Sequence, residues 1–558
     1  MSKSNFHNPT IETLESRIAP ASLNAALNVL TYKDLQGDSV KISFSHPVAS
    51  GDFTFNNAFA STGDQQLQLI DIDGQTALNG INIAVSVTHA PGGDGLAAIG
   101  AINAAGVNLG KVTIPGDIGQ IDAAAISTLS VQSIGLYGTA TQAAGAPSLT
   151  STITGGIGKL KVANDIQGAD IEITGAISLL SVGGGLNSGA EVSASGTITA
   201  AHIGGSISGG SDLDGSSITS VKVGADVRGE ISANTIGTVK IGGSDIGGGI
   251  SGTTSVGAVT IAHDLNENGR IESSSGTIAS LKIGGGISDR AYISGDTGVG
   301  PVTVGLDVTD GGYILSSAGT IGAVKIGGSL TGEYNSSTKS YISGDEGVGP
   351  VTIGGDLSYY GEILSPGGIV SSVKIAGSVS ETAKITADAI GNVTVGNDLR
   401  GEVTSEVGAI GAVKVGAGLY DATITSETNI GPVTVAGSVD DALIVAGISG
   451  TPGAITIGAI KVGGSWIQSS VTAGVTEGVS DNGYGNANDV LYATTSNIAS
   501  IDIAGAVVGA TSGDSTYGFD SQTIGSFKLD GFKIALPVGT GSVILSPETG
   551  GNVAIELI

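Results

Sequence analysis

The residues best suited to chemistry lie in a segment that interrupts an otherwise repetitive chain, "SDNGYGNANDV", from Ser480 to Val490. Its side chains offer the hard oxygen ligands that Ca²⁺ prefers: Asp481, Asn482, Asn486, Asn488 and Asp489. The spacing is not that of an EF-hand loop, and the Gly-Gly-x-Gly-x-Asp run of calcium-binding β-rolls is absent. The loop from Asp481 to Asp489 is the best candidate for specific binding, and a solvated turn of Asn and Gly is the alternative. We assign no metal ligand from the sequence alone.

Carbohydrate chemistry is the second possibility, because many parallel β-helices cleave acidic polysaccharides. Such an enzyme needs clustered carboxylates and a groove lined by aromatic rings. Aromatic residues make up 4% of the chain, with Trp466 the one tryptophan. The five histidines share no spacing: His7, His46, His89, His202 and His263. His202 and His263 lie in successive but separated coils and are expected to be surface residues, not a catalytic base. Tyr359, Tyr360 and the segment from Gly418 to Glu427 could form a small sugar-contact face, with exposed corner tyrosines as the alternative.

Neither a catalytic residue nor a cofactor-binding residue is predicted. The glycine-rich segment from Gly204 to Gly215 lacks the Gly-Lys-Ser/Thr that completes a phosphate loop. The repeat pattern accounts for its glycines, so we expect no nucleotide and no other cofactor.

A repeat of about twenty residues must position all of these groups. Its apolar anchor residues are Ile157, Ile177, Ile198, Ile218, Ile236, Val256, Ile278, Val299, Ile321, Val348, Val370, Ile390, Ile410, Ile430 and Ile457. Further apolar residues stand at offsets +3, +5, +9 and near +13 to +15, as in Val393, Val395, Leu399 and Val403 after Ile390. The alternation predicts a short strand with one buried face. A period near twenty is typical of one coil of a β-solenoid.

The polar residue at offset +4 alternates between Lys and Thr. From Lys240 the occupants are Lys240, Thr260, Lys282, Thr303, Lys325, Thr352, Lys374, Thr394, Lys414, Thr434 and Lys461. Stacked coils would lie ~4.8 Å apart, where like charges opposite each other are destabilising. The Thr coils carry Asp at offset +8, in Asp264, Asp307, Asp356 and Asp398. We interpret the pattern as basic and acidic stripes that stabilise the surface itself, with a pair of coils as the true repeat.

Glycine pairs follow each predicted strand. Examples are Gly327-Gly328 and Gly354-Gly355. We expect them to turn the corner of a coil, where a positive φ costs glycine little.

Composition excludes several classes of protein. The net charge of −28, from 22 basic against 50 acidic residues, repels phosphate backbones, so nucleic acid is not an expected partner. The absence of Cys excludes disulfides and thiolate metal sites. No apolar run reaches the ~18 to 20 residues of a spanning helix, so no transmembrane segment is expected.

The regions outside the coils read as caps. Residues 1–21 form a sorting-like or capping segment, with Ile11, Leu14 and Ile18 at helical spacing and a stop at Pro20. Residues 22–108 are predicted as a β-rich N-terminal domain or cap with strands in 38–46 and 81–90. The solenoid repeats follow in 109–470, an insertion loop in 471–497, and the last irregular coils and a C-terminal cap in 498–558. The end, 541–558, is expected to be a closing strand pair.

The N-terminal segment resembles a known motif. "LESRIAPA", from Leu14 to Ala21, looks like the Leu-Glu-x-Arg-x-Ala-Pro variant of the LEPR-type motif that precedes β-repeat surface or exported proteins of some Gram-negative bacteria. The matching residues are Leu14, Glu15, Arg17, Ala19 and Pro20. Ser16 stands where the family name has Pro. The resemblance implies export and a place at the cell surface, and it assigns no enzymatic activity.

These observations define one expectation for the whole chain. It is an all-β parallel β-solenoid, right-handed, with coils of about 20 residues. It serves as a non-enzymatic extracellular or cell-surface structural, adhesin-like protein, whose partners are cell-surface polysaccharide or other surface proteins. A polysaccharide-binding or polysaccharide-cleaving β-helix is the alternative. A cytoplasmic scaffold is the third reading, should the N-terminal motif be accidental.

Overall fold

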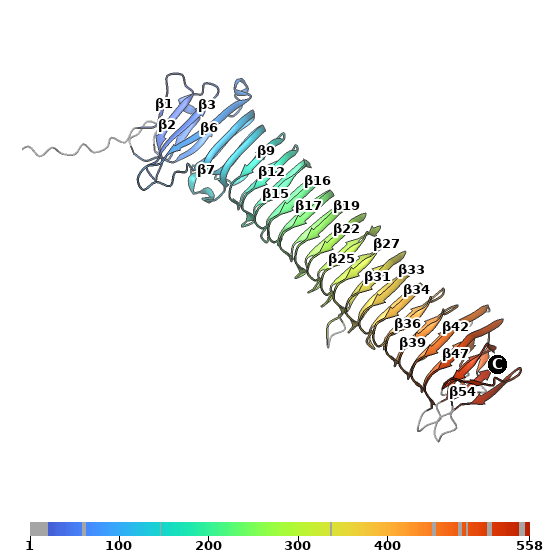
Figure 1. The fold of residues 1–558 in the computed structure, drawn as a ribbon. Coiled ribbons are helices and arrows are strands. Elements are labelled where there is room, and N and C mark those ends of the chain that lie inside the picture. The colour runs from blue at the N-terminus through green and yellow to red at the C-terminus, as the bar shows by residue number, and fades with distance from the viewer. Residues whose placement is uncertain are drawn as a thin grey trace, which may run out of the picture. The chain divides into compact units, whose positions relative to one another are not determined.

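The chain folds into β-strands joined by turns in the computed structural model (Figure 1). The structure describes residues 20–57, 63–145, 147–334, 338–448, 453–477, 483–486, 489–509, 516–545 and 553–558. These residues contain no α-helix, and their three short 3-10 helices are η1 (Ser50–Asp52), η2 (Thr76–Leu78) and η3 (Gly138–Thr141). The expected all-β class is confirmed. The chain divides into two compact units, Met1–Ser216 and Ser217–Ile558.

The first unit begins with antiparallel strands. β1 (Ser22–Leu23) pairs with β2 (Val29–Lys33), β2 pairs with β3 (Ser39–Phe44), and β3 pairs with β6 (Ile81–Thr88). Buried and exposed residues alternate in β3 and in most of β6, so one face of each strand meets the core. Both strands predicted in this region are confirmed.

Parallel pairing starts in the same unit. β5 (Leu67–Asp71) and β6 both pair in parallel with the long strand β7 (Ile99–Ile134), so the expected boundary at 108/109 falls inside a strand. Farther along the unit, β7 continues this pattern with β9 (Ile157–Val162). Four isoleucines in successive repeats lie opposite one another: Ile126, Ile157, Ile177 and Ile198.

In the second unit each repeat pairs in parallel and in register with the next. β28 (Val324–Ile326) and β31 (Gly347–Ile353), for example, place Val324 opposite Val351. The anchors form one ladder of opposed residues: Ile236, Val256, Ile278, Val299, Ile321, Val348, Val370, Ile390, Ile410, Ile430, Ile457, Ile498 and Ile524. After Ile457 the spacing between anchors becomes longer and irregular, yet Ile498 and Ile524 lie opposite one another in the same ladder.

Inward and outward positions follow the predicted alternation. Val393 and Val395 are buried, and Thr394 between them is partly exposed. Burying one such aliphatic side chain contributes ~1.5–3 kcal/mol relative to leaving it in water. The core is therefore built from stacked aliphatic residues, which explains how a chain with so few rings can fold.

A second inward ladder stands at offset +9, and one of its members is an acid. The ladder contains Val227, Asp245, Leu265, Ile287, Val308, Leu330, Leu357, Val379, Leu399, Leu419, Val439, Trp466 and Val507. Asp245 is fully buried, and neither carboxylate oxygen has a well-formed hydrogen bond, although the Gly248 amide lies nearby. Burial, assisted by Glu230, raises the pKa of Asp245 to about 7.

The alternating Lys and Thr residues form a single column on the outside. Lys325 lies opposite Thr303 on one side and Thr352 on the other. The same in-register pairing joins every member from Lys240 to Lys461, which confirms the predicted alternation. The column continues with Asp502 and Lys528. Side chains of like charge are therefore kept apart even where the repeats have irregular lengths.

The acidic residues at offset +8 bind the next repeat. Asp307 Oδ1 accepts a hydrogen bond from the Ser329 amide at 2.6 Å, and Asp356 Oδ1 accepts one from the Ser378 amide at 2.7 Å. Where the repeat carries Ser instead, the hydroxyl does the same, since Ser329 Oγ accepts the Asp356 amide at 3.0 Å. The interpretation as a stripe of surface charge was therefore incomplete, because these side chains hold the corners together.

The glycine pairs serve a purpose other than the expected one. Gly354 and Gly355 do not adopt a positive φ. A Cβ at Gly355 would lie 2.3 Å from Ser329 Oγ, and one at Gly354 would lie 2.1 Å from the Gly327 carbonyl oxygen. Close approach of neighbouring repeats, and not φ, requires these glycines. Positive φ occurs at other corner residues, among them Asp289, Arg290, Asp310, Tyr359, Tyr360, Asp421 and Asp441.

The C-terminal region closes with antiparallel strands. β53 (Gly541–Ile544) pairs with β54 (Val553–Leu557), which confirms the expected strand pair, and β54 also pairs in parallel with β49 (Tyr517–Ser521). The predicted insertion contains two short antiparallel strands, β45 (Val475–Thr476) and β46 (Val490–Leu491).

Part of the predicted N-terminal segment lies outside the described residues. This includes Leu14, Glu15, Arg17 and Ala19 of the motif, whereas Pro20 is exposed and Ala21 is buried. Within the described residues, no helix is long and apolar enough to cross a membrane.

Candidate functional site

Three acidic side chains converge near the end of the second unit. One carboxylate oxygen each of Asp489, Asp520 and Glu556 lies within 4.8 Å of the other two. Asp520 is fully buried, Asp489 is 7% exposed, and Glu556 is partly exposed. We call these three residues the carboxylate cluster.

The cluster forms where the insertion covers an outward-facing column of the sheet. Thr472 on β44 (Ser470–Ala473) lies opposite Asp520 on β49, which lies opposite Glu556 on β54. At the same position in earlier repeats Thr404 and Thr425 are partly exposed. Here Gly485 lies against Gly518, since a Cβ on Gly518 would come within 2.5 Å of the Gly485 Cα. The insertion thereby buries polar side chains that would otherwise be solvated.

The hydrogen bonds within the cluster are unevenly distributed. Asp489 Oδ2 accepts the amides of Gly485 at 2.7 Å and Asn486 at 3.1 Å. Neither oxygen of Asp520 has a hydrogen-bond partner, and Glu556 Oε2 has none either. The Gly485 amide, already bonded to Asp489, lies near enough to Asp520 to offset part of the burial effect on its pKa. The unpaired oxygens of Asp520 are the unusual feature, because buried polar groups normally find partners.

The electrostatics of the cluster disfavour three negative charges. Burial raises the pKa of Asp520 well above its usual range, and the charges of Asp489 and Glu556 raise it further. Burial and the charge of Asp489 raise the pKa of Glu556 to about 7. Among the described residues no Lys or Arg forms an ion pair with Asp520 or Glu556.

The sequence indicated part of this site. Asn486 and Asp489 of the predicted binding loop lie in it or beside it, and Asn486 Nδ2 donates to the Gly483 carbonyl at 2.6 Å. Asp481, Asn482 and Asn488 lie outside the described residues. Asp520 and Glu556 were not predicted, because no sequence signal placed them opposite the insertion.

A second acidic cluster, in the first unit, has a different character. Asp38 accepts the amides of Ala90 at 2.6 Å and Gly95 at 2.7 Å, and these bonds lower its pKa. Asp34 Oδ1 accepts the Asp38 amide at 2.8 Å. Together with Asp94 these carboxylates lie within 4.8 Å of one another, but their main contacts fix the backbone of loops. These contacts account for both oxygens of Asp38 and for Asp34 Oδ1, whereas Asp34 Oδ2 is buried without a hydrogen-bond partner.

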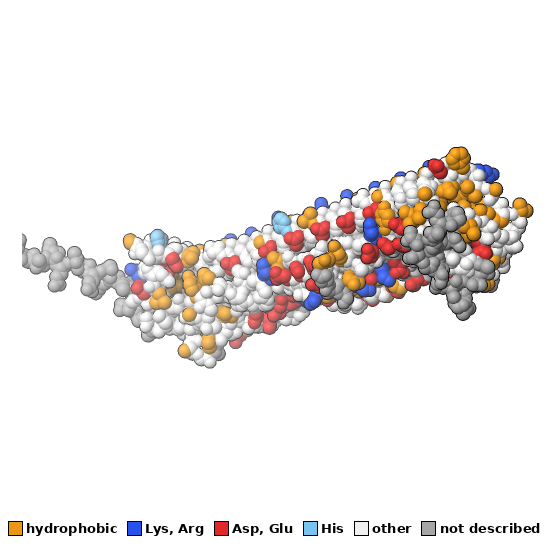
Figure 2. All heavy atoms as spheres, turned by 90° about the horizontal axis from the view of Figure 1, so that it is seen from below, with side chains coloured by type: hydrophobic (Ala, Val, Ile, Leu, Met, Phe, Trp, Pro, Cys, Tyr) orange, Lys and Arg blue, Asp and Glu red, His pale blue; other side chains and the backbone are white. Residues whose placement is uncertain are grey.

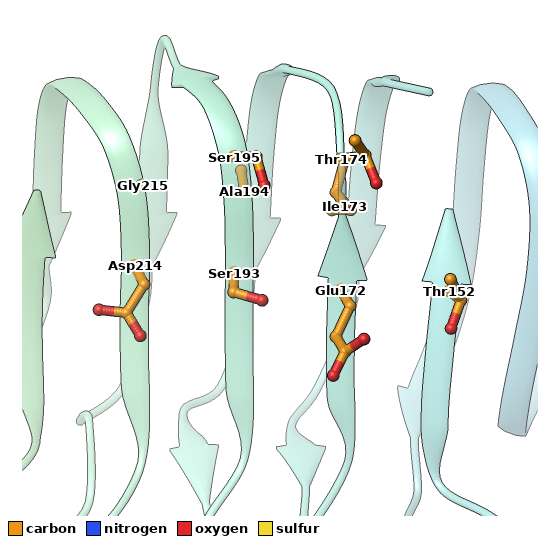
Figure 3. A pocket seen from close by; sticks show the side chains of 9 residues that line it. All are labelled: Thr152, Glu172, Ile173, Thr174, Ser193, Ala194, Ser195, Asp214 and Gly215. Carbon is orange, nitrogen blue, oxygen red and sulfur yellow. The ribbon is translucent and has the colours of Figure 1, made fainter. Parts of the chain in front are cut away.

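An acidic face with a shallow pocket lies elsewhere in the first unit (Figure 3). Glu172 lies opposite Thr152 and Ser193 in register, and Asp214 lines the same pocket, whose volume is about 370 Å³. Burial, and then the charge of Asp214, raises the pKa of Glu191 beside it. Figure 2 shows that Asp and Glu side chains are interspersed with Lys and Arg over the face in view. The carboxylates that line the pocket give this face a negative potential that attracts cations.

A stack of tyrosines bears on the polysaccharide alternative. The rings of Tyr292 and Tyr313 lie 5.1 Å apart at 3°, and those of Tyr313 and Tyr341 lie 4.8 Å apart at 9°. The Tyr292 hydroxyl donates to Glu272 at 2.9 Å, and burial together with this bond raises the pKa of Tyr292 to about 12. Both faces of Tyr313 are covered by its neighbours, so the stack does not offer that ring to a sugar.

Other residues considered from the sequence are accounted for by the fold. His202 and His263 are exposed, as expected, and each lies on the surface of a different unit. Trp466 is fully buried in the +9 ladder, with Nε1 donating to the Ser469 carbonyl at 2.8 Å, so it is no sugar platform. Tyr359 and Tyr360 are exposed corner residues with positive φ.

Comparison with protein-family models, curated proteins and solved structures found no match for this chain.

Proposed function

We propose that the chain is a right-handed parallel β-solenoid that acts as a non-enzymatic structural, adhesin-like protein at the cell surface or outside the cell. The in-register stacking of the repeats supports the solenoid, because each backbone pairs with the repeats before and after it. Right-handedness rests on its being the commoner hand among irregular β-solenoids.

The observation that carries the functional proposal is the regular use of polar side chains on the outside. The Lys and Thr residues form one in-register column, the corner Asp residues accept amides of the next repeat, and the tyrosine rings stack on one another. What remains on the surface is a regular array of polar side chains with an excess of acids, which suits many weak contacts that act together. Cell-surface polysaccharide or other surface proteins are the partners that fit this surface. The export route rests on the resemblance of Leu14 to Ala21 to the LEPR-type motif.

Protease treatment of intact source cells tests the location. We expect mass spectrometry to detect peptides from corner regions, such as those around Asp289 and Tyr359, in the supernatant before lysis. A cytoplasmic marker protein must stay intact in the same sample. Recovery of the chain from the soluble interior alone would contradict the proposal and favour an internal scaffold.

The non-enzymatic part has its own test. Purified chain should leave the viscosity of acidic polysaccharide solutions unchanged over hours. A fall in viscosity that depends on the chain would contradict this part and favour the polysaccharide-cleaving alternative.

A further inference from the structure

We propose that the carboxylate cluster, Asp489, Asp520 and Glu556, is a binding site for one Ca²⁺ ion. The inference is independent of where the protein is located. Such an ion would link the insertion to the last strands of the second unit, because Asp489 belongs to the former and the other two to the latter.

The spacing of the oxygens suits a single ion. Calcium binds oxygen ligands at about 2.3–2.6 Å, so two ligands on opposite sides of the ion are about 4.6–5.2 Å apart. The three carboxylate oxygens lie within 4.8 Å of one another. Thr472 Oγ1, on the strand beside Asp520, is also buried without a hydrogen-bond partner and offers a neutral oxygen ligand next to the acids.

Asp520 provides an observation that an acidic cluster alone would not. Its side chain is 0% exposed, and both oxygens lack partners. A proton on one oxygen would neutralise the charge and leave the other oxygen unsatisfied. A divalent cation would bind the oxygens of Asp520 and would also offset the charges of Asp489 and Glu556. Among the described residues, no Lys or Arg forms an ion pair with Asp520 or Glu556.

The ligand types select among metals. All the available groups are hard oxygens, from carboxylates and a hydroxyl, and the acids lie on a loop and two strands. Zn²⁺ and Cu²⁺ sites usually contain His or Cys, and Mg²⁺ demands near-ideal octahedral geometry and keeps several waters. Ligands that come from a loop and two strands are not arranged as a regular octahedron, so the site favours Ca²⁺, whose coordination is flexible.

The other acidic groups of the chain lack this combination. Asp38 uses both its oxygens to accept backbone amides. Asp34 Oδ1 accepts two backbone amides as well, so Asp34 Oδ2 is the one oxygen of these two residues that is buried without a partner. The face around Glu172 is open to solvent. Asp245 is also buried with two unpartnered oxygens, but it lies in the apolar ladder, and Glu230, the acid that raises its pKa, forms an ion pair with Arg270. Among the residues that the structure describes, the carboxylate cluster is the group of three closely spaced acids that contains a fully buried acid with both oxygens unpartnered.

Calorimetric titration of the chelator-treated full-length chain with CaCl₂, and separately with MgCl₂, tests the site. We expect one Ca²⁺ per chain above the diffuse binding of the acidic surface, and at least about tenfold weaker binding of Mg²⁺. Asp520→Asn should abolish the stoichiometric site, and Glu556→Gln should weaken it at least about tenfold. The matched controls Asp421→Asn and Glu172→Gln, both at exposed positions, should leave it unchanged.

Thermal unfolding separates binding from folding. Asp520→Asn removes the cost of burying an ionisable acid beside two others, so it should raise the melting temperature of the calcium-free chain. The rise in melting temperature that CaCl₂ causes in the parent chain should be lost in this variant. Terbium luminescence offers a second readout, since Tyr484 lies near Asp489 and Asp520 and can sensitise a bound ion. The absence of a stoichiometric Ca²⁺ site in the parent chain would overturn the proposal. Equal weakening by the controls would overturn it as well.

Discussion

Replacing Asp245 with Asn should change how the stability of the protein depends on pH. Asp245 occupies the inward +9 ladder between Val227 and Leu265, where other members are apolar. Its pKa is about 7 in the folded protein, against an ordinary value of 3.8. Folding therefore favours the protonated acid. The parent chain is most stable, as far as this group is concerned, below pH ~4, and it loses stability as the pH rises through 7.

The size of the effect follows from the pKa difference. Three pKa units at 1.36 kcal/mol each correspond to about 4 kcal/mol, which is an upper limit because water entry and relaxation reduce it. Glu230 raises this pKa and Arg270 lowers it, and their own ion pair stays the same in the variant. Asp245→Asn carries no titratable proton. Its stability relative to the parent should therefore increase by up to about 4 kcal/mol between pH 4 and pH 8.

Urea denaturation followed by circular dichroism at pH 4, 5, 6, 7 and 8 measures this difference. Asp421→Asn, at an exposed corner, serves as the control and should follow the parent curve. Parallel curves for Asp245→Asn and the parent would refute the reasoning, because they would mean that Asp245 is solvated or already neutral throughout.

Three further predictions test the ladders and the corners. Val393→Asp should lower the stability by at least about 3 kcal/mol, whereas Thr394→Ser beside it should change it by less than about 0.5 kcal/mol; equal effects in urea denaturation would refute the inward and outward assignment. Thr394→Lys places three lysines in register with Lys374 and Lys414, so it should cost about 1 kcal/mol at low salt and less in 1 M NaCl; a loss that ignores salt would contradict the like-charge argument. Asp356→Ala should cost about 1 kcal/mol through the lost acceptor of the next repeat's amide, and Asp356→Asn should retain most of it; melting curves that rank the two variants the other way would refute the corner role.

The repeating part of the fold could be predicted from the sequence in detail. Residues such as Ile390 and Val393 recur with the spacing of a half-buried strand, and identical neighbours enforce one register. Even Ile498 and Ile524 could be found as later members, although the gaps before them are irregular. The reason for the glycine pairs was missed, because a close approach between repeats depends on the corner geometry and leaves the same sequence signal as a positive φ.

The candidate site was far less predictable. Asp489 could be singled out because it interrupts the repeat. Asp520 and Glu556 could not, because their alignment opposite Thr472 depends on the lengths of irregular connections that carry no periodic signal. Asp245 shows the converse case. Its offset from Ile236 places an acid in the apolar ladder, so the sequence contained the information, and counting offsets in each repeat would have revealed it.

The alternating outer column limits how the length of this protein can change. Deleting one repeat, residues 390–409, would bring Lys374 against Lys414 in the stacked column. Deleting two, residues 370–409, would bring Thr352 against Lys414 and Asp356 beside Gly418, which are the pairings found in the intact chain between Thr394 and Lys414 and between Asp398 and Gly418. Stable shortened or extended forms of the chain should therefore differ from it by an even number of repeats, because the pair of repeats is the unit that preserves the outer column.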